Sequence, residues 1–160
     1  MRPCCAAGQQ GHRARRTARH QVVHLSCHSM VDNEPPADSG LVLHDHDKQP
    51  LTVADISRLH LVDAELAFLS ACSTMGAGIP VLDEAVHITS AFVPAGYRQV
   101  VGTLWPIIDF GAAQLTEAFY SELPQDLRRA PYALHHAVCQ MRASCPDEPR
   151  LWAAHIHVGR

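Results

Sequence analysis

The sequence has no hydrophobic run long enough to cross a membrane as a helix. Such a span takes roughly 20 consecutive apolar residues, and polar residues interrupt every apolar stretch here well before that length. It also has no excess of basic residues, since 13 Lys and Arg stand against 16 Asp and Glu for a net charge of −3. Beyond residue 20 the basic residues are scattered, so they form no footprint for nucleic acid. We therefore expect neither a membrane nor a nucleic acid as partner.

The cysteines do not have the regular spacing of a disulfide framework. There are six of them, at positions 4, 5, 27, 72, 139 and 145. Cys27 and Cys72 come at the ends of apolar segments, where a reduced thiol packs as a small hydrophobe. Because the sequence also shows no secretory signal, we expect a reduced, cytoplasmic protein.

The composition is that of one globular domain with an unusual beginning. An apolar fraction of 47% and a charged fraction of 18% are ordinary for a folded protein, and 160 residues fit a single domain. The first 19 residues differ, because they contain five arginines, no acidic residue and almost no large apolar side chain. We predict a disordered or aberrant extension over residues 1–19 and a folded domain over residues 20–160.

Short apolar segments alternate with amphipathic ones along the rest of the chain. The short apolar segments predict buried strands at 20–26, 66–71 and 99–105, and the first of them is dense in β-branched residues. Helical spacing predicts helices at 82–96, 108–123 and 128–143, and residues 41–52 are typical of a hairpin. Thr52 and Asp55 are spaced as a capping box for a short helix, and the tail 151–158 predicts a helical turn or an edge strand. This alternation favours an α/β fold with a mostly parallel sheet covered on both faces.

Two of the predicted strands are followed closely by a reactive side chain. These are His28 and, 44 residues later, Cys72. Carboxyl ends of parallel strands meet at one edge of a sheet, where open α/β sheets place their active sites. A cysteine nucleophile needs an imidazole to take its proton, because a thiol has a pKa near 8.5. Backbone N–H groups near Ser29 and Cys72 would then stabilise the oxyanion. A histidine about 50 residues before an Ala-Cys segment is typical of caspase-like peptidases. The competing interpretation is that Cys72 is merely a buried apolar residue.

Five segments in the same order resemble the CHAT family of bacterial caspase-like domains, relatives of separase usually found behind TPR repeats. They are VVHLSCHS, SGLVLHDHDKQPLTVADI, LAFLSACSTM, LDEAVHITSAFVPAGYRQVVGTLWPIID and LWAAHIHVG. The resemblance implies a three-layer caspase-like α/β fold and a cysteine peptidase that cleaves a polypeptide through a dyad of His28 and Cys72. It implies no metal and no cofactor. His24, in the same strand, matches the family's H-x-x-C-H pattern and is interpreted as a packing residue.

The chain departs from the family in two places. Ser29 stands where family members usually have glycine, which permits a positive φ and a close approach of substrate to backbone. The strands and helices that precede the histidine strand in the family have no counterpart, so we expect a sheet that lacks its N-terminal portion. TPR repeats or a missing N-terminal segment are then the expected partners besides the substrate. A catalytically silent interaction module, or a truncated fragment, is the alternative that these departures favour.

Three further residues are candidates beside the dyad. Asp83 and Glu84 are interpreted as acidic residues of a substrate pocket that selects a basic side chain. The alternative is that they are acids in the first turn of a helix, where the helix dipole favours them. Trp105 resembles the family's Thr-Leu-Trp segment and is expected either to line the substrate groove or to pack in the core. Asp109 is predicted to cap the following helix rather than to act as an orienting carboxylate.

A metal site is the last alternative. His44 and His46 would share one face of a strand, which suits two ligands. No third ligand is spaced to complete a closed site, so we expect no metal. A metal-dependent hydrolase that used these histidines would lose its activity to a chelator and not to alkylation.

Overall fold

The computed structural model describes residues 21–30, 39–44, 51–75, 82–123 and 125–159. The predicted extension over residues 1–19 lies outside these ranges, so the division of the chain at residue 19 stays a prediction. The strands are β1 (Val22–Met30), β2 (Gly40–Val42), β3 (Leu51–Thr52), β4 (Leu66–Met75), β5 (Gln99–Thr103) and β6 (His155–Gly159). The helices are α2 (Val53–Ser57), α3 (Leu82–Ala95), α4 (Asp109–Glu122), α5 (Ala130–Ser144) and α6 (Pro149–Trp152), with a 3₁₀ turn at Leu127–Arg129.

Among the described residues the strands form one six-stranded sheet in the order β3-β2-β1-β4-β5-β6. β4 lies between β1 and β5 and is parallel to both. The strands outside this parallel centre, β2, β3 and β6, pair antiparallel with their neighbours. The predicted hairpin is confirmed as β2 and β3, and the tail forms both predicted structures, a helical turn (α6) and an edge strand (β6). The α/β fold class is therefore confirmed, with the parallel strands at the centre of the sheet.

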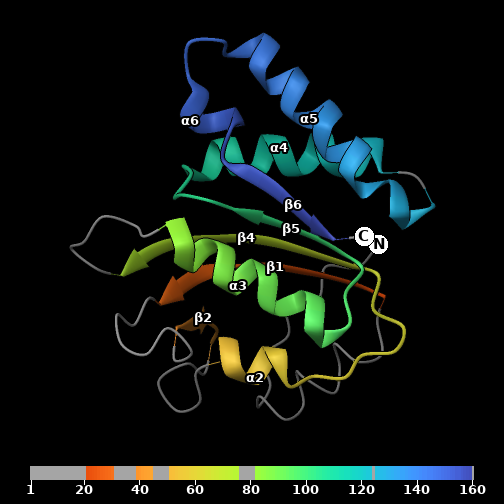
Figure 1. The fold of residues 1–160 in the computed structure, drawn as a ribbon. Helices are drawn as coiled ribbons and strands as arrows, with labels where there is room; N and C mark the ends of the chain where they lie inside the picture. The colour runs from red at the N-terminus through yellow and green to blue at the C-terminus, as the bar shows by residue number, and fades with distance from the viewer. Residues whose placement is uncertain (1–20, 31–38, 45–50, 76–81, 124, 160) are drawn as a thin grey trace.

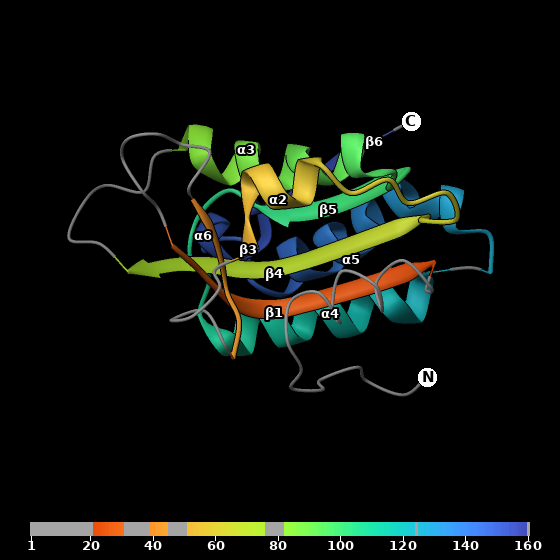
Figure 2. The ribbon, with the colours of Figure 1, turned by 90° about the horizontal axis from the view of Figure 1, so that it is seen from below.

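Helices cover the sheet on two sides, which makes three layers (Figure 1). Figure 2 shows α2 and α3 on one side of the strands and α4 on the other. Adjacent residues of β4 belong to different cores: Phe68 packs with the α4 and α5 cluster, and Leu69 packs with the α2 and α3 cluster. Both side chains are almost fully buried. A central strand buried on both faces is expected to be a continuous apolar run, as residues 66–69 of β4 are.

The ends of two helices follow the sequence expectations. The Thr52 hydroxyl accepts a bond of 3.1 Å from the Asp55 N–H, and the Asp55 carboxylate accepts one of 3.3 Å from the Thr52 N–H, so the capping box is confirmed. α3 ends at Ala95, before Gly96 with φ +119°, as a glycine stop predicts. The predicted cap at Asp109 is wrong, because α4 begins at Asp109 itself with Ile108 as N-cap and no side-chain cap bond.

None of the helices in the described ranges has both the length and the apolar character that crossing a bilayer takes.

Two glycines allow a matched test of backbone constraint. Gly96 has a positive φ, and a Cβ there would collide with the backbone oxygen of Leu61. We expect Gly96→Ala to lower the free energy of unfolding by more than 1 kcal/mol, measured by urea denaturation. Gly111 lies in α4, and a Cβ there meets the tip of the Leu151 side chain at 3.1 Å, which can yield.

Gly111→Ala is the control, since a helical alanine gains up to about 1 kcal/mol over glycine. We expect it to leave stability nearly unchanged or slightly raised. Equal losses in both variants would contradict the assignment of the cost to the backbone of Gly96.

Candidate functional site

His28 and Cys72 occupy paired positions on adjacent parallel strands. The register of β1 against β4 runs from Val22 opposite Leu66 to His28 opposite Cys72. Neighbouring strands in a sheet lie about 4.8 Å apart, so the backbones of the two residues are direct neighbours. Cys72 is described by its backbone alone. Both positions are near the carboxyl ends of their strands, which lie at the same end of the molecule (Figure 1).

Alternation along β1 places His28 on the side of the sheet that α4 covers. Val23, Leu25 and Cys27 pack against the α2 and α3 cluster. His24 lies on the opposite face, since its ring contacts Tyr120 of α4. Because side chains of a strand alternate between faces, His28 belongs to the face of His24. His28 is also exposed, so its imidazole is accessible to a ligand from solvent.

Ser29 lies in regular strand and is buried. It pairs with Leu41 of β2 and Ser73 of β4, and the register shifts directly after it, between Ser29 and Met30. No non-glycine residue in the described ranges has a positive φ. The backbone at Ser29 therefore does not use the freedom that glycine would supply. Serine in place of glycine imposes no backbone strain at this position.

His24 makes packing contacts, as its interpretation from sequence states. Its ring lies 5.0 Å from that of Phe68 and 5.6 Å from that of Tyr120, between centroids. The Tyr120 hydroxyl and His24 Nδ1 are 3.3 Å apart and form a hydrogen bond. Burial against these rings lowers the pKa of His24 and raises that of Tyr120 to about 12. Sequence reasoning missed Tyr120, because nothing local indicates a partner 96 residues away.

The other candidates lie at the same end of the sheet, on separate elements. Asp83 is the second residue of α3, which begins where β1 and β4 end (Figure 1). Trp105 follows β5, and its indole N–H donates to the backbone oxygen of Arg150 at 2.9 Å. That bond fixes the polar edge of Trp105 to α6. Asp109 is exposed in the first turn of α4.

His44 and His46 are the two histidines that the sequence offers as candidate metal ligands. His44 is exposed, and His46 lies outside the described residues. In the part of the chain that the structure describes, no three His, Cys, Asp or Glu side chains are grouped as metal ligands.

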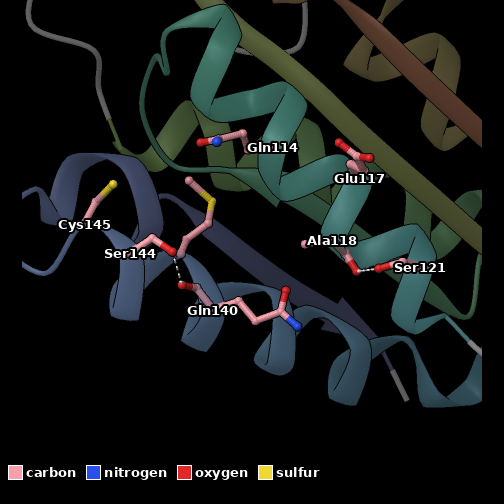
Figure 3. A pocket seen from close by; sticks show the side chains of 8 residues that line it. Gln114, Glu117, Ala118, Ser121, Gln140, Ser144 and Cys145 are labelled. Atoms are coloured by element: carbon pink, nitrogen blue, oxygen red, sulfur yellow. Dashed lines mark hydrogen bonds between the residues drawn. The ribbon is translucent and has the colours of Figure 1, made fainter.

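A groove of about 340 Å³ lies between α4 and the end of α5 (Figure 3). Its lining residues are Gln114, Glu117, Ala118, Ser121, Gln140, Met141, Ser144 and Cys145. The hydroxyl groups of Ser121 and Ser144 donate to carbonyls of their own helices, at 2.8 and 3.1 Å. None of the candidate residues from the sequence lines this groove. It pairs no nucleophile with a base, so we do not assign the chemistry to it.

The most strongly perturbed histidine begins the edge strand β6, opposite Thr103, the last residue of β5. His155 is 8% exposed, and neither ring nitrogen has a hydrogen-bond partner among the described residues. Its ring lies 6.2 Å from that of Phe68, between centroids. Burial lowers its pKa from 6.5 to about 4. A neutral imidazole without partners suits packing rather than proton transfer.

Comparison with models of known protein families identifies a family. The model of the family described as CHAT domain matches residues 9–160, which is all but the first eight residues. The match includes every described strand and helix. No curated protein matches the chain.

Acidification tests the burial of His155. Its folded pKa of about 4 lies below the unfolded value of 6.5, so the unfolded state binds more protons between these pH values. We expect stability to fall as the pH drops from 6.5 to 4, by roughly 1.4 kcal/mol per pH unit from this group. His155→Phe should remove that part of the slope in urea denaturation. His136→Phe, at an exposed position of α5, should keep it, and an unchanged slope in His155→Phe would contradict the assignment.

Proposed function

The chain belongs to the CHAT domain family of caspase-like, peptidase-related domains, and on that premise we propose that it is a cysteine endopeptidase. Cys72 is the nucleophile and His28 the general base and acid. The substrate is a polypeptide segment that crosses the carboxyl end of the sheet. The reaction needs neither a metal nor a cofactor. A reduced compartment, the cytoplasm, keeps the thiol of Cys72 available.

The register of β1 against β4 is the observation that supports this proposal. It pairs His28 directly with Cys72, and residues paired across neighbouring strands share a face of the sheet. A slip of one residue would turn one of the two side chains to the other face. The exposure of His28 supports access by substrate.

The chemistry follows from the two groups. His28 takes the thiol proton, and the Cys72 sulfur attacks the peptide carbonyl to form a tetrahedral oxyanion. Backbone N–H groups near Ser29 and Cys72 stabilise that charge. The C–N bond breaks as His28 protonates the leaving amine, which leaves a thioester. Water then attacks the thioester, with His28 again as base, and releases a carboxylic acid and the free thiol.

The remaining candidates concern the substrate and partners. Asp83, at the start of α3, would attract a basic side chain of the substrate. Trp105, held by its bond to Arg150, would offer the face of its ring to the peptide. TPR repeats or an N-terminal segment of the family's kind would be partners of the domain.

A catalytically silent interaction module is the second candidate function. Ser29 is the observation that favours it, because a buried serine occupies the position next to the histidine where the family usually has glycine. The two functions differ in one property, the reactivity of the Cys72 thiol.

The pH dependence of alkylation measures that reactivity. We expect Cys72 to be alkylated by iodoacetamide well below about pH 8.5, the ordinary thiol pKa. In His28→Ala the profile should return to that of an ordinary thiol, because the imidazole no longer takes the proton. Mass spectrometry resolves each cysteine, and the same thiols in the urea-unfolded chain serve as the reference thiols, because Cys139 Sγ lies 3.7 Å from His135 Nε2 in the folded chain.

His136→Ala is the matched control, since it removes an exposed histidine from α5 and should leave the profile unchanged. A Cys72 that behaves as the reference thiols do, with or without His28, would refute the dyad and leave the silent module.

Cleavage itself is tested with Cys72→Ala and His28→Ala. Each should lower the rate of peptide cleavage by a factor on the order of 10⁴ or more, while circular dichroism shows an unchanged fold. Cleavage that persists in Cys72→Ala would refute the assignment. Ser29→Gly tests the departure from the family in the same assay, and we expect it to keep or raise the activity.

A further inference from the structure

Three cysteines have side chains that the structure describes, and one of them, Cys139, is exposed. Cys27 and Cys145 are half-buried, and none of the three is in a disulfide. Cys139 belongs to α5, which lies on the outside of its layer (Figure 1). The inward positions of this helix, among them Ala137 and Met141, pack in the core cluster. A free thiol on the outward side of α5 is therefore accessible to reagents from solvent, as reactive cysteines are.

His135 supplies a base for this thiol. Its Nε2 lies 3.7 Å from Cys139 Sγ, which is hydrogen-bonding distance for a sulfur atom. The two residues are four positions apart, so the helix itself places them on one face, one turn from each other. The His135 side chain is exposed as well. A cysteine within hydrogen-bond reach of a base is the arrangement that activates a thiol as a nucleophile.

The surroundings of the pair favour this chemistry. The rings of His135 and His136 meet edge to face, with their centroids 5.9 Å apart, so the imidazole has a second contact that limits its orientation. Every residue of α5 is described, and the helix contains no Asp or Glu and one charged side chain, that of Arg142. A sulfur that becomes negative as it attacks therefore meets no like charge on its own helix.

Cys145 is a comparable thiol without a base. It is the C-cap of α5, and its backbone N–H donates to the oxygen of Met141 at 2.8 Å. The residue one turn before Cys145 is thus Met141, whose thioether takes no proton at neutral pH. The pairing of Cys139 with His135 is a property of that position and not of every thiol on this helix.

We propose that Cys139 is a site of reversible S-thiolation, at which His135 activates the thiol towards a small disulfide of the glutathione type. His135 takes the thiol proton, and the Cys139 sulfur attacks one sulfur of the disulfide. The S–S bond of the reagent breaks as the new S–S bond forms, and the departing thiolate takes the proton from His135. One disulfide and one thiol are consumed and one of each is produced, so the step needs no further oxidant.

The site is separate from the proposed dyad, so the inference does not depend on the proposed function. Cys139 lies on the outward side of α5, whereas Cys72 belongs to β4 in the sheet. In a reduced compartment the Cys139 thiol stays free, and the mixed disulfide accumulates when the ratio of small disulfide to small thiol rises. The modification would then mark the surface of the domain under oxidising conditions and leave its core unchanged.

Mass spectrometry of the full chain, resolved by cysteine, tests this inference. The chain is incubated with oxidised glutathione at neutral pH, either folded or unfolded in urea, and the adduct on each cysteine is followed over time. An unassisted thiol is only a few per cent thiolate at this pH, so we expect Cys139 to react about tenfold faster in the folded chain. Unfolding increases access to the thiol, so exposure alone predicts the opposite order.

His135→Ala should lower the rate at Cys139 of the folded chain about tenfold, to that of the unfolded chain, and leave Cys145 unchanged. Alanine suits an exposed helical position, so circular dichroism should show an unchanged fold. His60→Ala is the matched control, since it removes an exposed histidine whose Nδ1 lies 2.9 Å from the Arg58 backbone oxygen, and both rates should stay the same.

The remaining outcomes decide against the site. A Cys139 rate that is equal in the folded and unfolded chain, or that survives His135→Ala, overturns it. An equal loss at Cys145 also overturns it, because the effect would then belong to the helix and not to the imidazole. Reduced glutathione should remove the adduct, and an adduct that resists this thiol contradicts reversible exchange.

Discussion

The parallel pairing of β1 with β4 is the interaction on which the rest of the structure depends. It joins two segments that are far apart in the sequence and sets His28 opposite Cys72. The same pairing sorts the side chains of both strands onto two faces, because alternation along one strand is matched by alternation along the other. A shift of one residue in this register would move every apolar residue of one strand to the wrong core. The burial of β4 on both faces therefore also holds the candidate dyad in register.

The two helical layers have different consequences for the site. The α2 and α3 layer packs against Val23, Leu25 and Cys27 and anchors the odd positions of β1. The α4 and α5 layer covers the opposite face. There Phe68 of β4 packs in its core, and Tyr120 of α4 forms a hydrogen bond with His24 of β1. Towards the carboxyl end of β1 this second layer leaves His28 exposed. A face that is packed at one end and open at the other suits a polypeptide site, since the packed part fixes the strands and the open part admits a ligand.

Much of the local structure could be predicted from the sequence, because it depends on neighbouring residues. Helical spacing predicts α3, α4 and α5, and the capping box at Thr52 and Asp55 is present. The wrong prediction concerned the cap at Asp109, since the segment before α4 is positioned by the burial of Ile107 and not by the best local cap. The hydrogen bond between His24 and Tyr120 could not be predicted, because it joins positions that only the packing of α4 against β1 brings together.

The sequence by itself determined the kinds of elements, their order and the two reactive residue types, His28 and Cys72, because these follow from composition and short-range periodicity. The family resemblance, carried by ordered segments, was likewise present in the sequence, and the family match bears it out. Only the tertiary structure decided which strands are neighbours, in which register, and that Ser29 lies in extended backbone. It also decided that Ile108 and Phe110 remain in solvent. The physical reason is that register and exposure are set by burial over the whole sheet, which no local segment specifies.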